Sequence, residues 1–282
     1  MQQSVLTSLI MPIAIGTIML GLGLSLTIED FRRVVKYPKA IAIALVCQMF
    51  LLPVLCFFLV RIYGLPPALA VGLLLVAASP GGPSANLYSH LSNGDVALNI
   101  SLTAINSFLS LFTLPLIVNL ALRYFMDTDQ YMPMQFQKVI EVFAIVLLPA
   151  TLGMVIRGKA AGFAARMDKP VKILSALFLA TVIVTVAIRE RALLVDTFTQ
   201  LGIPVLLFNA LSMAMGYFLP QLFRIEKRQA IAIGMEIGIH NATLAIFIAL
   251  NVLNNPAMSL PPALYGLLMF FTAAVFGFLV RR

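Results

Sequence analysis

The sequence predicts an all-α polytopic membrane protein with nine transmembrane helices, arranged as an inverted repeat in which two discontinuous helices cross. Three observations predict this fold. Hydrophobic residues make up 61% of the 282-residue chain and charged residues 11%, whereas soluble domains have about 45–50% and about 25%. Nine apolar segments each approach the roughly 20 residues that a helix needs to cross a bilayer. Two of these segments carry polar or helix-breaking residues at mid-membrane depth, which is typical of discontinuous helices.

The predicted spans are joined by short polar connections, so we expect one membrane domain over residues 1–282 and no soluble domain. The first Lys or Arg is Arg32, so the first apolar segment lacks the basic n-region of a secretory signal and is expected to be a mature span. Cys47 and Cys56 lie on opposite faces of one predicted helix and cannot bridge each other. The spans are expected at about 5–28, 38–61, 66–91, 95–124, 134–157, 170–189, 198–222, 227–252 and 260–280.

The basic residues predict the orientation of the chain. Alternate connections carry 14 and 5 of the 19 Lys and Arg residues, and the positive-inside rule assigns the richer side to the cytoplasm. We therefore expect the N-terminus outside and the C-terminus in the cytoplasm, in a plasma or inner membrane. The net charge of +8 reports this orientation and requires no nucleic acid partner. The expected cytoplasmic residues are Arg32, Arg33, Lys36, Lys39, Arg157, Lys159, Arg166, Lys169, Lys172, Arg224, Lys227, Arg228, Arg281 and Arg282.

Two spans are predicted to break near the middle of the bilayer. The stretch SPGGPSAN, residues 79–86, places two prolines and two glycines in one span, which removes backbone donors and loosens the helix. In GMEIGIHNATLAIFIAL, residues 234–250, an acid, an imidazole and an amide interrupt another span. Helix ends that meet at the midplane present partial positive charge to an anion and carbonyl groups to a cation, so they predict a ligand site. A packing kink without a ligand is the structural alternative.

Glu236 is the acid in the second of these spans, and a bare carboxylate at that depth costs several kcal/mol. The neighbouring spans contain no Lys or Arg, so we expect a small cation or a proton to neutralise it. Gln48, Asn86, Asn99 and Thr103 offer hard oxygen donors, which suit an alkali or alkaline-earth ion better than a transition metal. Two alternatives stay open: a protonated, hydrogen-bonded Glu236, and amide side chains that only join helices.

The two broken spans also indicate an internal repeat. Gln48 lies 31 residues before the first break at Ser79, and Asn209 lies 32 residues before the second break at Asn241. The broken spans are five apart in the chain, so they run in opposite directions, as an inverted repeat requires. Nine spans then correspond to a five-plus-five plan with one helix missing.

The residues argue against several other classes of membrane protein. A metalloprotease needs clustered metal ligands, but the chain has two histidines, His90 and His240, and no H-E-x-x-H motif. All six aspartates fall in connections or at helix ends, so neither an intramembrane aspartyl protease nor a magnesium-dependent prenyl-transferring enzyme is expected. We therefore expect no enzymatic activity. A passive channel or an ion-binding scaffold could use the same oxygen-lined site and stays open.

Three stretches are specific enough to compare with a known family: GLGLSLTIEDF, SPGGPSANLYSHLSNGDVALNISLT and EIGIHNATLA. Together they resemble the bile acid:sodium symporter family, over nearly the whole chain. The resemblance implies a transporter with a core domain, here about 38–124 and 198–280, that contains the crossed broken helices. It also implies a smaller panel domain, here about 5–28 and 134–189, with the substrate cavity between the two domains.

The same resemblance implies two sodium sites that share Glu236. The residues implied for the first site are Ala85, Asn86, Asn99, Thr103 and Glu236. The residues implied for the second are Gln48, Glu236, His240 and the main-chain oxygens of Ile237 and Ile239. The residues expected to face the transported anion are Gly81, Gly82, Pro83, Ser84 and Asn241.

The chain departs from the family pattern at four places. Ala85 stands where members commonly have Ser, which removes a hydroxyl but leaves the carbonyl. Pro83 occupies a place often held by Thr, and LLMFFT in the last span is apolar apart from its final Thr, so the substrate is not implied. His240 stands where the motif usually ends in Gln. A neutral imidazole is a softer donor than an amide oxygen, and a protonated one repels sodium.

The sequence therefore predicts sodium-coupled import of an organic anion by alternating access. Bile-acid-like steroids and small carboxylates such as keto or hydroxy acids stay open as the anion. Because a free imidazole titrates near pH 6.5, a proton-coupled or mixed sodium/proton carrier is the main alternative, beside a purely hydrogen-bonding role for His240. The expected partners are the anion, sodium ions and lipid, with the chain acting as a monomer and no other cofactor.

Overall fold

The structure is a computed structural model that describes residues 11–32, 35–126, 136–189 and 191–281. Over these residues the regular elements are helices, and one isolated bridge joins Gly81 to His240. The predicted all-α class is therefore confirmed. The first ten residues, which include the start of the predicted first span, lie outside the described residues, and so does the predicted external connection at 127–135.

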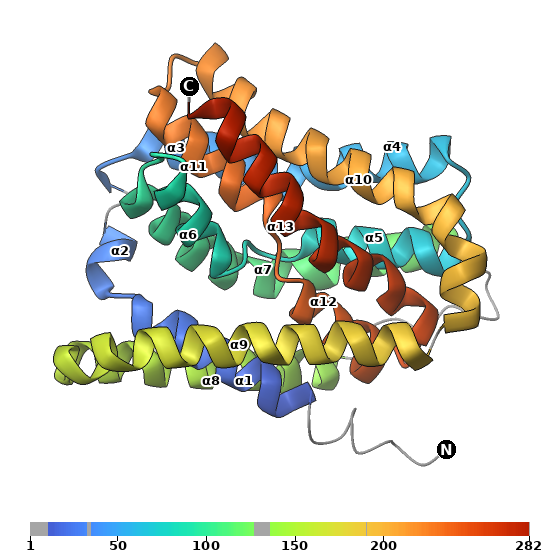
Figure 1. Cartoon of the computed structure of the whole chain (residues 1–282), viewed down its shortest axis with the longest axis horizontal. Helices are drawn as coiled ribbons and strands as arrows, with labels where there is room; N and C mark the ends of the chain where they lie inside the picture. The colour runs from blue at the N-terminus through green and yellow to red at the C-terminus, as the bar shows by residue number, and fades with distance from the viewer. Residues whose placement is uncertain (1–10, 33–34, 127–135, 190, 282) are drawn as a thin grey trace.

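Helices cover most of the described residues of the predicted spans, and Figure 1 shows their arrangement. Residues 29–32, 161–169 and 191–197, which were predicted as connections, are also helical. The first half of the chain forms α1 (Met11–Ser25), α2 (Ile28–Arg32), α3 (Pro38–Val46), a π-helix (Cys47–Leu51), α4 (Leu52–Ile62), α5 (Pro67–Ala78), α6 (Ser84–Leu91) and α7 (Val96–Phe125). The second half forms α8 (Phe136–Lys159), α9 (Ala161–Arg189), α10 (Arg191–Leu222), α11 (Lys227–Gly238), α12 (Ala242–Phe247), a π-helix (Ile248–Val252), a 3₁₀ helix (Pro256–Ser259) and α13 (Leu260–Val280).

Within the described residues, four helical stretches are long and apolar enough to cross a membrane. Each carries a large apolar side chain that is more than half exposed: Phe50, Phe112, Phe218 and Phe271. Such a surface is unfavourable in water and is the expected lipid-facing surface in a bilayer. The protein is an integral membrane protein. The four stretches are Pro38–Ile62, Val96–Phe125, Thr199–Leu222 and Pro256–Val280, and the shorter apolar helices are Pro12–Ser25, Pro67–Ala78 and Ala242–Val252.

Both predicted helix interruptions are observed. Helix α5 ends at Ala78 because Ser79 turns into extended backbone (φ −72°, ψ 144°), and Pro80 cannot donate the next helical hydrogen bond. The chain returns to helix at Ser84, the start of α6. Helix α11 ends at Gly238, where Ile239 leaves the helical region (φ −112°, ψ 91°) without any proline nearby.

The two helix interruptions supply hydrogen-bond partners for each other's backbone groups. The Gly82 N–H donates to the Ile239 carbonyl at 2.7 Å, and the Asn241 N–H donates to the Pro80 carbonyl at 2.9 Å. These bonds form the short antiparallel bridge between the two breaks. Backbone groups released from a helix inside a bilayer must find protein partners. Each break is therefore tolerated because the other one is beside it.

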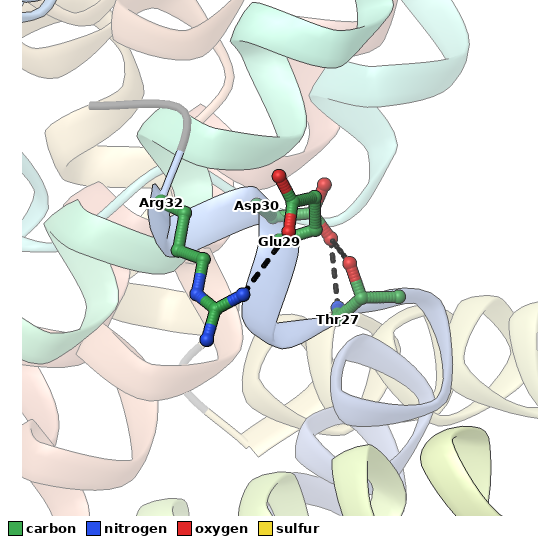
Figure 2. Close-up of polar contacts among 4 residues, drawn as sticks. All are labelled: Thr27, Glu29, Asp30 and Arg32. Atoms are coloured by element: carbon green, nitrogen blue, oxygen red, sulfur yellow. Dashed lines mark hydrogen bonds and ion pairs between the residues drawn. The ribbon is translucent and has the colours of Figure 1, made fainter. Parts of the chain in front are cut away.

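A capping motif starts α2, the short helix after α1 (Figure 2). The Asp30 carboxylate accepts from the Thr27 N–H at 2.7 Å and from the Thr27 hydroxyl at 2.8 Å, which resembles a capping box. Asp30 is 4% exposed, whereas the neighbouring Arg32–Glu29 pair, at 3.7 Å, lies in solvent. An exposed pair of this kind contributes little stability. The buried cap explains why TIED follows the end of α1.

Helices α1, α8 and α9 pack together along one side of the molecule (Figure 1). Gly23 of α1 and Gly153 of α8 lie where these two helices cross, and a Cβ atom on either would overlap backbone atoms of the other helix. Small residues at such a crossing let two membrane helices approach closely. The remaining helices contact this group where α13 and α10 pack on α9 and where α12 packs on α1.

Candidate functional site

The Glu236 carboxylate lies fully buried where α11, α7 and the α5–α6 break meet. The Thr103 hydroxyl donates to Oε2 at 2.6 Å, and the Asn106 amide donates to Oε1 at 3.0 Å. The Gly81 backbone lies directly against the carboxylate as a third neutral contact. Neutral groups supply all three contacts, so the structure provides hydrogen bonds for the carboxylate but no protein counter-charge among them.

Gly81 makes this arrangement possible. A Cβ atom at this residue would overlap the Glu236 carboxylate, so no larger residue fits beside it. At Gly82 a Cβ atom would instead meet the His240 carbonyl oxygen at 3.2 Å. The two glycines therefore differ: the first makes room for the acid, and the second allows the close approach of the two breaks.

One face of α7 lines this site. Asn99, Thr103 and Asn106 are spaced at i, i+4 and i+7, which places them on one side of the helix. The Asn99 amide donates to the Ala232 carbonyl of α11 at 2.7 Å. These contacts make a polar seam between α7 and α11, and the seam ends at Glu236. Sequence analysis predicted Asn99 and Thr103 but missed Asn106.

Several buried polar side-chain atoms of the described residues have no hydrogen-bond partner. They are the side-chain oxygens of Gln48, Asn86, Ser89, Asn99 and Asn106 and the His240 Nε2. In Gln48, Asn99 and Asn106 the NH₂ group donates to a carbonyl or carboxylate oxygen, which can only accept, so the amide oxygen is the atom left over. Buried acceptors without a donor are uncommon. Asn106 contacts the Glu236 carboxylate directly, and its unpartnered oxygen, with that of Asn99 on the same face of α7, fits a bound cation.

Gln48 and His240 meet at the end of α5. Gln48 lies in the π-helix between α3 and α4, and its amide donates to the Ser79 carbonyl at 3.0 Å. His240 Nδ1 is 3.0 Å from the same carbonyl oxygen, so Nδ1 carries the proton and Nε2 is a lone-pair acceptor. The Phe208 ring stacks on the imidazole with 6.2 Å between the ring centroids, and the Tyr265 ring meets it edge-on with 5.4 Å between the centroids. The ring is therefore held in one orientation.

Asn209 bonds a carbonyl group at the end of α11, as Gln48 does at the end of α5. Its amide donates to the Gly238 carbonyl at 2.8 Å, and Tyr265 donates to the same oxygen at 2.8 Å. The Thr272 hydroxyl hydrogen-bonds the Asn209 Oδ1. Gln48 and Asn209 thus both hold the carbonyl groups where a broken helix stops. They differ in that both ends of the Asn209 amide are satisfied, while the Gln48 oxygen is not.

Two of the residues predicted to face the anion, Gly82 and Asn241, bond the two helix breaks to each other. The N–H groups of Gly82 and Asn241 bond the opposite break, and the Asn241 side chain caps α12 by accepting from Leu244 N–H at 3.1 Å. Gly81, Gly82 and Asn241 are buried, whereas Pro83 and Ser84 are partly exposed. Ala85 and the two carbonyl residues of the predicted second site, Ile237 and Ile239, are also buried. The Ile239 carbonyl already accepts one hydrogen bond, from Gly82.

Comparison with known proteins identifies the family. The model of the Sodium Bile acid symporter family matches residues 12–197, which include α1, the first break and the Asn99–Asn106 face of α7. The chain belongs to the sodium bile acid symporter family. Glu236 and the second break lie beyond the matched residues.

Relatives cover more of the chain than the sodium bile acid symporter model does. The hepatic sodium/bile acid cotransporter of Homo sapiens is 29% identical over 265 residues, 94% of this chain and 74% of that protein. The uncharacterized sodium-dependent transporter YocS of Bacillus subtilis is 25% identical over 255 residues, 90% of this chain and 77% of that protein. A probable chloroplastic sodium/metabolite cotransporter, BASS2 of Oryza sativa subsp. japonica, is 27% identical over 251 residues, 89% of this chain and 59% of that protein. The chain thus spans about three fifths of the rice protein.

Proposed function

We propose that this protein is a sodium-coupled secondary active importer of an organic anion that works by alternating access. The observation that carries the proposal is the buried Glu236 carboxylate, which contacts only neutral donors and has unpartnered amide oxygens near its contacts. One carboxylate with neutral oxygens is a donor set for a hard cation of low charge. The relatives named above, a sodium/bile acid cotransporter, a sodium-dependent transporter and a probable sodium/metabolite cotransporter, support the same function.

The proposed ion sites keep the predicted residues. The first site takes Glu236 and Thr103 with the unpartnered oxygens of Asn86 and Asn99 and the Ala85 carbonyl. The second takes Glu236, the unpartnered Gln48 oxygen, main-chain oxygens at Ile237 and Ile239, and His240. The hydrogen bond that the Ile239 carbonyl accepts occupies one of its two lone pairs and leaves the other available.

Charge balance supplies the coupling. Two sodium ions, one carboxylate and one monovalent anion sum to zero, whereas the empty site retains a negative charge in a low dielectric. Partially loaded states are therefore disfavoured. Since coupling is reciprocal, sodium raises the affinity for the anion by the same factor that the anion raises the affinity for sodium. We propose that the anion binds beside the crossing, near Gly81–Ser84 and Asn241, where the partly exposed Pro83 and Ser84 offer access.

The proposed architecture has nine spans in an inverted repeat with one helix missing. The matching roles of Gln48 and Asn209, each holding the end of a broken helix, support the repeat. The packing of α1, α8 and α9 on one another supports a panel domain made of these helices. The other helices then form the core domain, with the anion cavity between the two.

Counterflow tests the proposed function. The purified protein is first screened by thermal shift against steroid conjugates and small keto and hydroxy acids, with sodium or with potassium. A substrate found this way is then loaded, unlabelled, into proteoliposomes. A carrier takes up labelled substrate by exchange without net flux, and we expect this exchange to require sodium. An ion-binding scaffold would show sodium stabilisation without exchange, and a channel would show net flux without counterflow.

Cysteine labelling checks the proposed topology. In a variant without Cys47 and Cys56, single cysteines replace Gln130, which lies outside the described residues, or Gly162, where a side chain meets nothing within 4 Å. The positive-inside rule places the first outside and the second in the cytoplasm. We expect an impermeant thiol reagent to label only the cysteine at 130 in intact cells. Labelling at 162 would reverse the orientation.

A mixed sodium/proton carrier is the second candidate, and the unpartnered His240 Nε2 favours it. An imidazole nitrogen is a softer ligand than an amide oxygen, and a charged imidazole repels sodium. We expect wild-type uptake to show a shallow sodium dependence with lower apparent sodium affinity at pH 6 than at pH 8. His240→Gln should steepen the curve and remove the pH difference. If the sodium titrations of the two proteins superimpose at both pH values, His240 has no ionic role.

A further inference from the structure

Asn106 is a buried residue whose amide nitrogen has a hydrogen-bond partner and whose amide oxygen has none. The residue is 1% exposed, and its NH₂ group donates to Glu236 Oε1 at 3.0 Å. Its Oδ1 is buried and has no hydrogen-bond partner. The orientation of the amide is set by the carboxylate, which offers acceptor oxygens to the NH₂ group. The carbonyl oxygen is therefore presented to the interior without a donor.

We propose that Asn106 is a further sodium-site residue, which positions the Glu236 carboxylate through its nitrogen and offers its oxygen to the ion. This inference rests on the proposed sodium site. Thr103 holds Oε2 and Asn106 holds Oε1, so each carboxylate oxygen has its own contact from α7. Asn106 thus extends the ligand set on the Oε1 side, where no other side chain is assigned.

Three hydroxyl side chains of α7 show a different arrangement. Ser101, Ser110 and Thr113 each donate back to a carbonyl of their own helix, at 2.9, 2.9 and 3.3 Å. Such bonds satisfy a hydroxyl locally and need no ligand. Asn106 instead reaches across to α11 and leaves an oxygen unused.

Asn209 gives a second contrast, because it shows what a purely structural amide looks like in this protein. Its nitrogen donates to Gly238, and its oxygen accepts from Thr272. An amide that only joins helices is expected to have both ends satisfied in this way. The Asn106 oxygen has no hydrogen-bond partner, and neither has the oxygen of Asn99, which lies at the other end of the same face of α7. Two unpartnered amide oxygens therefore flank Thr103 along the helix.

Sodium-dependent thermal stabilisation of the purified protein tests the proposal. The half-saturating sodium concentration is measured for wild type, Asn106→Leu and the control Asn251→Leu. The amide of Asn251 bonds only its own helix turn, at 3.2 Å to Phe247. We expect about a tenfold higher half-saturating concentration for Asn106→Leu and an unchanged value for the control. The melting temperature without sodium separately reports the structural cost of each substitution. A change below threefold in Asn106→Leu would overturn the proposal.

Asn106→Asp provides the test if the leucine variant does not fold. It keeps the size of the side chain and places a second carboxylate beside Glu236, which makes a donor set suited to a divalent ion. We expect calcium to stabilise Asn106→Asp and not wild type. Wild-type sodium affinity together with no calcium response in this variant would overturn the proposal. If wild type itself shows no sodium stabilisation, the proposed sodium site fails, and this outcome is distinct from a failure of Asn106 alone.

Discussion

We expect Glu236→Gln to abolish sodium-dependent uptake while the protein remains folded. Glutamine keeps the shape of the side chain and can still accept from Thr103, whose hydroxyl lies 2.6 Å from Oε2. It removes the negative charge of the buried carboxylate, which is the charge that the proposed cation site relies on. A buried cation without a counter-charge costs several kcal/mol, so sodium affinity should fall by at least about a hundredfold, or roughly 2.7 kcal/mol. Uptake with and without a sodium gradient measures the effect.

Glu226→Gln is the matched control. Glu226 precedes the first turn of the same helix, α11, and is exposed with no side-chain cap bond. The substitution removes one carboxylate from the same helix at the surface, where charge is screened by solvent. It should leave uptake and its sodium dependence at the wild-type level. Sodium-stimulated uptake near wild-type level in Glu236→Gln would remove Glu236 from the ion site.

The first helix break could be predicted from the sequence for a local reason. SPGGPSAN combines two residues without a backbone donor and two with high conformational freedom, and no uninterrupted helix accommodates all four. The second break contains no proline, and only its polar residues and the faint repeat indicated it. Its physical cause is tertiary, because the helix stops where its backbone bonds the other break. The Ile239 carbonyl accepts from the Gly82 N–H, and the Asn241 N–H donates to the Pro80 carbonyl. Single-sequence patterns do not contain that pairing.

Part of the candidate site could not be predicted for a related reason. Helix α7 carries Asn99, Thr103 and Asn106 together with several serines, and composition does not say which of them face Glu236. A search at helical spacing from Asn99 would have found Asn106 at i+7, on the same face as Thr103. The orientation of each amide is decided by the acceptor on the opposite helix. The sequence identifies the residues near the acid, but only the packed structure shows which oxygens are unpartnered.

The predicted anion contacts illustrate the same limit. The N–H groups of broken helices were expected to point at a substrate, as helix ends in transporters often do. In this structure, the Gly82 and Asn241 N–H groups bond carbonyls of the opposite break. The antiparallel register of the two breaks decides this use of the backbone donors. Their contact with substrate stays a prediction, and Pro83 and Ser84 are the partly exposed residues of the predicted anion contacts.

Gly81→Ala is expected to weaken sodium binding by about tenfold or more, although it adds one methyl group. The added Cβ would overlap the Glu236 carboxylate. The backbone around Gly81 has little freedom to retreat, because the Gly82 N–H and the Pro80 carbonyl are both bonded to the second break, at 2.7 and 2.9 Å. The carboxylate must then move away from Thr103 and lose that contact or the one from Asn106. The half-saturating sodium concentration for thermal stabilisation measures the change.

Two other glycines separate this local effect from a general sensitivity of the fold. At Gly82 a Cβ atom would lie 3.2 Å from the His240 carbonyl oxygen, so the bridge between the breaks must shift by a few tenths of an ångström. Gly82→Ala should lower the melting temperature slightly and change sodium affinity less than threefold. At Gly158, where a Cβ meets nothing within 4 Å, alanine should change neither quantity. Wild-type sodium affinity in Gly81→Ala would mean that the carboxylate can leave its contacts without cost. The contacts of the carboxylate with Thr103 and Asn106 would then not determine the sodium affinity. The ion would have to bind through the amide oxygens alone.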